Sequence, residues 1–299
     1  LYEIFDRPKS DLKSKRNIDL KVTVMNEPSI NAMATLSDEI IINTGLLYKL
    51  FNSIYRDTTF DKPIQKIVEK CNIKDDFAYI KKSIYIVTIS ICYFHELGHI
   101  VNGHLKYIHR DKHCFETLSE ALDETGLSST ITKYKDRSLF EHDADTYAGI
   151  SITGLVFNNF GIKCPKDKKK LLEKYAVLVS SFILFFTLRQ ISHGQESDIY
   201  PPYIWRFYSM AWSFLESHSS MQEEDGLPTK DIAIEIDDDF IRKNYDNDTK
   251  ELFSDIYSAV GFAFSDIENI FNSPNMATWY EFYRKNLSKI SECHDFAAQ

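Results

Sequence analysis

Residues 93–104 read YFHELGHIVNGH and close a long apolar stretch, 83–101, whose composition predicts one buried helix ending near Asn102-Gly103. Residues four apart lie on one face of a helix, so His95 and His99 can direct both imidazoles at a single ion. Glu96 lies about 100° around the helix from His95, within reach of a water molecule on that ion. The spacing therefore predicts a zinc site with a glutamate beside it. The alternative is a pair of histidines hydrogen-bonded inside a helical bundle.

A zinc hydrolase needs a third protein ligand, and the candidate lies in SLFEHDADTYAG, residues 138–149. A helix is expected from about 138 to 157, and on it Glu141 and Asp145 share one face. Glu141 would ligate the metal, while Asp145 would accept the remaining N–H of a ligand histidine and fix its tautomer. A capping box is the alternative, because Ser138 to Glu141 also has the pattern in which a glutamate only ties down a helix start.

The remaining histidines and acids near these motifs are assigned no ligand role. His142 and Asp143 flank Glu141 and are interpreted as outer or surface groups. His104 lies beyond the expected end of the first helix, and His294 lies in a polar segment.

The organisation of the chain predicts an α+β protein that is mostly α. Residues 19 to 43 hold the expected sheet, because DLKVTVM, INAMATL and DEIIINT are rich in β-forming residues and separated by turn residues. Helices are then expected at about 45–55, 64–70, 83–101, 138–157, 168–190, 203–217, 247–264 and 276–289. The polar segments 105–137 and 219–240 are expected to pass over the mouth of the site.

Composition narrows the classes of partner. A net charge of −9 argues against nucleic acid, because phosphate binding needs a basic face. Five scattered cysteines without a CxxC pair predict a reducing, cytoplasmic setting. The longest apolar runs, 84–94 and 176–188, are shorter than the ~20 residues that cross a bilayer, so no spanning segment is expected. The sequence indicates no oligomeric state.

Taken together, these motifs resemble the gluzincin metallopeptidases, in particular the HtpX and CAAX-prenyl-protease type. HExxH is followed by ExxAD, and HELGHIVNGH resembles the extended zinc-helix motif of that family. Residues 28–50 are similar to its NAxA strand, second strand and helix, and YPPYIWRF (200–207) resembles its HPP…R segment. The pieces span about two thirds of the chain, with unfamiliar spacers. The HExxHxxxxH and ExxAD pattern also resembles Lit-type phage-exclusion peptidases, which are bacterial and similar in length.

The resemblance implies a zincin-like core and zinc-dependent hydrolysis of peptide bonds. His95, His99 and Glu141 would hold one Zn²⁺, and Glu96 would be the general base. Asn31-Ala32-Met33-Ala34 would present an edge strand to which a protein or peptide substrate adds; an ordinary sheet edge is the alternative.

The family also implies a hydrogen-bond donor for the oxyanion, upstream of an arginine. Tyr200 matches the position of the family's histidine, with Arg206 as the arginine, and His193 is a rival for the same role. Arg206 could instead be structural and pair with Asp145 or Asp198.

The function expected is therefore a cytoplasmic zinc endopeptidase, with residues 1–217 as the catalytic domain and 218–299 as a helical extension packed on it. Two alternatives stay open. One is a regulatory peptidase of the ImmA/IrrE type that cleaves a partner repressor, although no basic recognition helix is visible. The other is a non-catalytic binding module in which zinc braces the fold or binds a partner.

Overall fold

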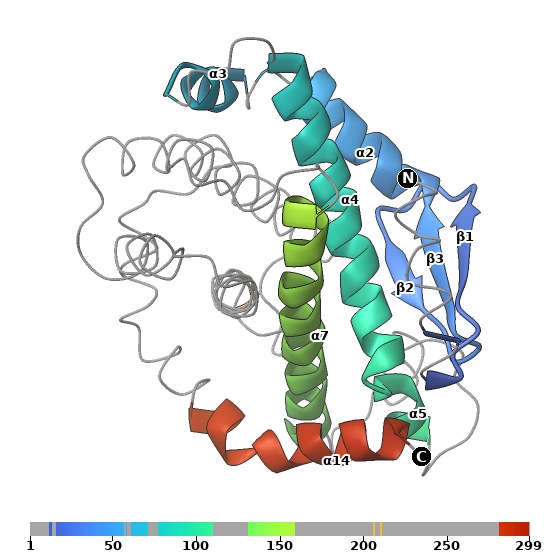
Figure 1. Cartoon of the computed structure of the whole chain (residues 1–299). Helices are drawn as coiled ribbons and strands as arrows, with labels where there is room; N and C mark the ends of the chain where they lie inside the picture. Colours follow the sequence, from blue (N-terminus) through green and yellow to red (C-terminus); the bar gives the residue numbers. More distant parts are fainter. Residues whose placement is uncertain are drawn as a thin grey trace.

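The fold combines helices with one small sheet, which confirms the α+β, mostly α class (Figure 1). The computed structural model describes residues 12–13, 16–56, 58, 61–70, 77–109, 131–158, 206, 210 and 281–298. Its elements are β1 (Lys21–Met25), β2 (Ala32–Ala34), β3 (Glu39–Asn43), α2 (Thr44–Tyr55), α3 (Asp61–Lys70), α4 (Phe77–Val101), α5 (His104–His109), α7 (Ile131–Asn158) and α14 (Leu287–Ala297).

The sheet has the order β1-β3-β2. β1 runs parallel to β3, whereas β2 runs antiparallel to it and lies at the edge of the sheet. Ile40 and Ile42 of β3 are buried, as alternation along a half-buried strand requires. β2 is the strand that contacts α4 most, and Figure 1 shows it nearest to that helix. The three expected strands and the helix after them are thus confirmed.

The core of the described protein is the pair α4 and α7. α4 has 25 residues and buries side chains on nearly every face, because the sheet covers one side and α7 the other (Figure 1). Gly98 makes the close approach of the two helices possible. A Cβ at that position would lie 3.1 Å from the Cα of Ala144 and 3.2 Å from the Cβ of Tyr147.

Several helix boundaries were predicted wrongly. α4 begins at Phe77 and α7 begins at Ile131, so both helices start earlier than expected. Part of the supposed excursion 105–137 is therefore helical, in α5 and in the first turns of α7. These polar turns lack the apolar spacing from which a helix is inferred. Ser138 lies inside α7, not at its start, so the capping-box interpretation of Glu141 is wrong.

The end of the described chain is also more helical than expected. Residues 281–285 are helical, Asn286 is a turn, and α14 extends to Ala297. α14 packs on α5 and α7, across their ends in Figure 1. The expected helices 168–190 and 247–264, the loop 219–240 and the boundary at 217 lie outside the described residues. Arg206 and Met210 are both helical, in line with the helix expected at 203–217.

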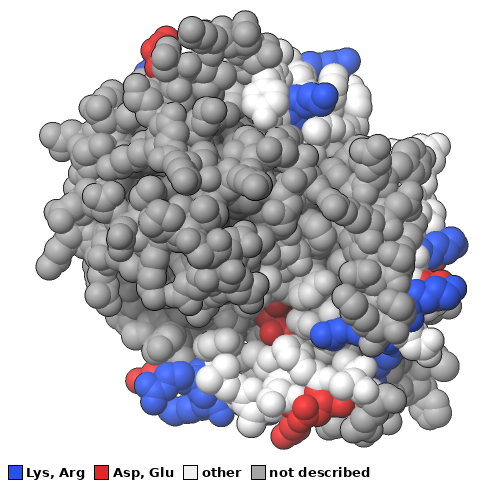
Figure 2. Space-filling model, in the orientation of Figure 1, with Lys and Arg blue, Asp and Glu red and all other residues white. Residues whose placement is uncertain are grey.

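One described helix is long and apolar enough to cross a membrane by length and composition, although the apolar run alone predicted none. This helix is α4, and 89% of its most apolar window is buried inside the protein. A buried core helix passes the same test, so the observation does not distinguish a membrane-spanning helix from a core helix. On the face drawn in Figure 2, the Lys and Arg side chains of the described residues lie at the top, at the lower left and at the right, where an acidic side chain lies among them.

Candidate metal centre

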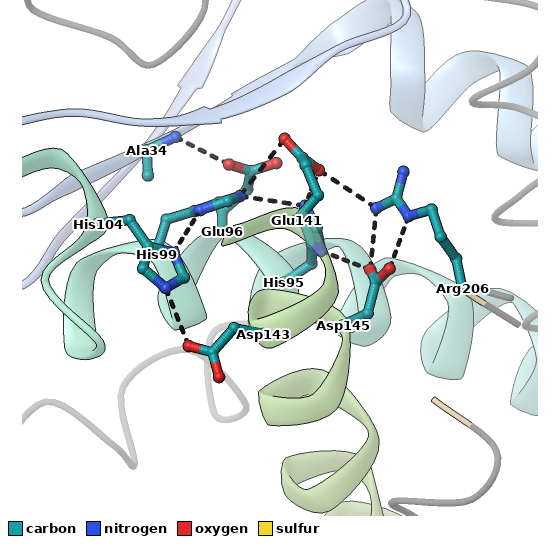
Figure 3. A network of polar contacts seen from close by, with 9 residues as sticks. All are labelled: Ala34, His95, Glu96, His99, His104, Glu141, Asp143, Asp145 and Arg206. Atoms are coloured by element: carbon teal, nitrogen blue, oxygen red, sulfur yellow. Dashed lines mark hydrogen bonds and ion pairs between the residues drawn. The ribbon is translucent and has the colours of Figure 1, made fainter. Parts of the chain in front are cut away.

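Two histidines of α4 and one glutamate of α7 converge in the core. The Nε2 atoms of His95 and His99 lie 3.3 Å apart. The Glu141 carboxylate completes the triangle, with Oε2 3.3 Å from His95 Nε2 and Oε1 3.9 Å from His99 Nε2. All three side chains are buried and point toward one another (Figure 3). The three residues predicted as ligands are therefore brought to one point.

The spacing of these atoms fits a divalent cation. Ligand atoms at the usual distance from a tetrahedral zinc lie about 3.3–3.4 Å from one another. Hydrogen-bonded nitrogen and oxygen atoms are usually closer, at about 2.7–3.2 Å. Two imidazoles and one carboxylate also form a donor set found in zinc hydrolases, with a further position left for water or substrate. The group could therefore hold a metal.

A buried ion pair between Asp145 and Arg206 orients the ring of His95. Its Nδ1 lies 2.8 Å from Asp145 Oδ1. Asp145 follows Glu141 by four residues, and this spacing predicted that it would contact the outer nitrogen of a ligand histidine. Arg206 donates two hydrogen bonds to the same carboxylate, from Nε to Oδ2 at 2.6 Å and from Nη2 to Oδ1 at 2.9 Å. Nη2 also donates to Glu141 Oε2 at 3.3 Å. Of the alternatives for Arg206, the structure shows the pairing with Asp145.

The local electrostatics favour positive charge between these groups. Burial acts to raise the pKa of Glu141, but His95, His99 and Arg206 outweigh it and hold that pKa well below its usual value. Burial likewise acts to lower the pKa of His95, but Asp145 and Glu141 outweigh it and raise that pKa. Glu141 is therefore ionised, and the site favours a proton or a cation beside His95.

Glu96 faces the edge of the sheet. Its Oε2 accepts the backbone N–H of Ala34 at 3.0 Å, and Figure 3 shows it on the Ala34 side of the three ligands. Asn31 and Thr35 hydrogen-bond to β3 through their backbones. Because antiparallel pairing alternates, the main-chain groups of Ala32 and Ala34 are directed away from β3, and there the N–H of Ala34 meets Glu96. Within the described residues, no strand pairs with that edge.

A second polar cluster, which the sequence did not predict, lies next to His99. His99 Nδ1 is 2.8 Å from His104 Nδ1, and His104 Nε2 is 2.9 Å from Asp143 Oδ2. The same oxygen accepts the Asn102 side-chain amide at 2.7 Å and contacts His294 Nε2 at 2.8 Å. His294 lies 151 residues from Asp143 in the sequence, and no local pattern joins them. Only the HExxHxxxxH spacing pointed to His104.

Two predicted residues cannot be placed. Tyr200 and His193, the rivals for the oxyanion donor, lie outside the described residues, so that assignment stays a prediction.

His142, next to Glu141, is buried with its ring 4.3 Å from that of Tyr283, and burial lowers its pKa to about 4. The ring is therefore uncharged at neutral pH, and the expectation that His142 lies at the surface is wrong.

Comparison with known proteins gives no match: no family model, no curated protein and no solved structure is similar to this chain. The resemblance to gluzincins therefore rests on the motifs, and the site rests on the geometry of its own residues.

Proposed function

We propose that this protein is a zinc-dependent endopeptidase of the gluzincin type, with a zincin-like core formed by the sheet, α4 and α7. The observation that carries the proposal is the convergence of His95, His99 and Glu141 at the spacing that zinc ligands adopt. Zinc supplies Lewis acidity toward the scissile carbonyl and toward a water molecule. In keeping with the Lit-type resemblance, the proposed setting is the cytoplasm and the proposed substrate is a protein.

Glu96 is the proposed general base. It follows His95 in the same helical turn, and the N–H of Ala34 fixes the position of one of its carboxylate oxygens. It would take a proton from the attacking water and deliver that proton to the leaving amine. Asp145 and Arg206 would hold the ring of His95 and the carboxylate of Glu141 during these transfers.

The edge of β2 is the proposed substrate strand. Ala32 directs main-chain groups away from β3, and the N–H of Ala34 on the same side is held by Glu96. An extended peptide that adds there would align its backbone with the site through main-chain hydrogen bonds. Glu96 is only 5% exposed, so the proposal requires a change of conformation before a peptide can reach it.

This burial favours one other function, a module in which zinc braces the fold. Structural zinc sites are closed, whereas catalytic sites keep an open position. Glu96 separates the two proposals, because a bracing site does not need a base.

The test is a proteome cleavage screen with wild type and Glu96→Gln. The endopeptidase proposal expects cleavage by wild type, a loss of about 10²–10⁴-fold in rate for Glu96→Gln, and unchanged zinc content in both proteins. Glu281→Gln is the matched control, since Glu281 is 73% exposed and lies on the surface. Equal biological effect of wild type and Glu96→Gln would support the bracing module and overturn the peptidase.

A further inference from the structure

We propose that His104 is a positioning residue for the metal ligand His99, and that Asp143 and His294 connect this support to the C-terminal helix α14. The proposal rests on the proposed metal site but not on peptidase activity. Four side chains form the chain of contacts: His99, His104, Asp143 and His294. Of these, only His294 is substantially exposed.

The proton positions follow from the metal. If His99 holds a cation through Nε2, its neutral ring carries the proton on Nδ1. That N–H then donates to His104 Nδ1, 2.8 Å away. A neutral His104 accepting at Nδ1 must carry its own proton on Nε2, which lies 2.9 Å from Asp143 Oδ2. Each ring is therefore held in one tautomer by the next group in the chain.

His99 thus receives the same kind of support as His95, but through one additional ring. Asp145 contacts His95 directly, whereas Asp143 reaches His99 through His104. In both cases a carboxylate fixes the orientation and tautomer of a ligand ring. This explains why a histidine occupies position 104, close behind the ligand.

A second metal ion is the competing explanation, because His104, Asp143 and His294 offer ligand atoms close together. Two observations and one consequence of the proposed tautomers argue against it. Their contacts of 2.8–2.9 Å are hydrogen-bond distances, shorter than the spacing of zinc ligands. The amide of Asn102 donates to the same oxygen of Asp143 at 2.7 Å. His104 Nε2 carries a proton whenever His99 binds metal as proposed, so it has no lone pair for a cation.

The packing of α14 holds His294 in place. Cys293, next to it, donates to the backbone oxygen of Asn102 at 3.2 Å. Gly103 has a φ of +73°, and a Cβ there would lie 2.4 Å from the Cβ of Ala297. α14 therefore contacts the turn between the ligand helix and His104 directly. The C-terminal helix supports the metal site from a distance in sequence of nearly two hundred residues.

Zinc affinity measured by chelator competition on the full chain tests this proposal. His104→Leu removes the acceptor for His99 and is expected to weaken zinc binding about 10–100-fold. His104→Asn places an amide oxygen near the position of Nδ1 and is expected to restore most of the affinity. His294→Leu is expected to have a smaller effect in the same direction. Tyr107→Phe is the control. It removes the hydrogen bond from Tyr107 in α5 to Glu292 in α14, which is not one of the contacts that join His99 to His294.

A purely structural role would give a different pattern. It would lower the melting temperature of the metal-free protein but leave unchanged the rise in melting temperature that zinc produces. A loss of positioning would instead make that rise smaller. Unchanged affinity in His104→Leu would overturn the proposal, as would equal losses in His104→Leu and His104→Asn. Two zinc ions per chain, one of them lost in His294→Leu, would establish a second metal site instead. A zinc-binding wild type without peptidase activity would refute only the proposed function.

Discussion

Two histidine-carboxylate clusters meet at His99, and they differ in spacing. On one side, His95, His99 and Glu141 have contacts of 3.3 Å and more. On the other side, His104, Asn102 and His294 surround one oxygen of Asp143 at 2.7–2.9 Å. Residue type alone would assign a metal to either cluster. The distances distinguish them: the first leaves room for a cation, and the second is joined by hydrogen bonds.

Removing one carboxylate from each cluster should have the largest and most unequal effect. Glu141→Ala deletes a metal ligand, so stoichiometric zinc should be lost. Asp143→Ala deletes only a hydrogen-bond acceptor, so one zinc should remain, bound about 10–100-fold more weakly. Metal analysis after dialysis, followed by chelator competition, measures both. Loss of zinc from both variants alike would contradict the distinction between the clusters.

Arg206→Met should lower stability strongly, because it leaves Asp145 as a buried carboxylate without its guanidinium. Removing one partner of a buried ion pair typically costs about 3–5 kcal/mol in the free energy of unfolding. Burial acts to raise the pKa of Asp145, and Arg206 is the main group that lowers it. Denaturant unfolding at neutral pH measures the loss.

Arg284→Met, at an exposed position, serves as the control and should change stability by less than about 0.5 kcal/mol. His104→Leu should cost less than Arg206→Met, since the support of His99 includes no arginine. Equal losses from the two substitutions would show that both sides of the site depend on charge to the same degree.

Gly98→Ala should have a moderate effect on both stability and zinc binding. The new Cβ would lie 3.1 Å from the Cα of Ala144 and would push α7, and with it Glu141, away from the histidines. Overpacking of this kind costs about 1–3 kcal/mol. Unfolding and zinc titration of the same sample check it. Wild-type values for both would show that the helix spacing does not limit the site.

The smallest expected effect concerns the pKa of His294. The contact with Asp143 raises this pKa above 6.5, against the opposing effect of partial burial. The contact therefore stabilises the fold below the unfolded pKa and loses its contribution as the pH rises through the folded value. NMR titration of the ring should show a pKa above 6.5 in wild type and one closer to 6.5 in Asp143→Ala. Identical titrations would remove His294 from the second cluster.

The sequence predicted that His95, His99 and Glu141 come together. It did not predict which residues surround them. Four-residue spacing within a helix places His95 with His99, and Glu141 with Asp145, because those pairs lie one turn apart. The strands of residues 19–43 were recoverable for a similar reason, since their pattern is local. The contact of His294 with Asp143 joins residues far apart in the chain, and no periodicity encodes it. The polar first turns of α7 carry no apolar pattern, so its start was placed too late.

The contribution of Gly98 was also invisible in the sequence. A glycine within HELGH gives no sign of which helix approaches it, and only the packing of α7 shows the reason. Glu96 and β2 form an intermediate case. The resemblance implied an edge strand beside the base, and the structure places the N–H of Ala34 on Glu96.

The most direct test of the proposed metal centre is the zinc K-edge X-ray absorption spectrum of the purified protein, with its metal content measured in parallel. We expect one zinc per chain, with two imidazole nitrogens and carboxylate oxygen at about 2.0–2.2 Å. We also expect Glu141→Ala to lose that spectrum. No stoichiometric metal after zinc loading, or sulfur neighbours at about 2.3 Å, would show that His95, His99 and Glu141 do not form the site.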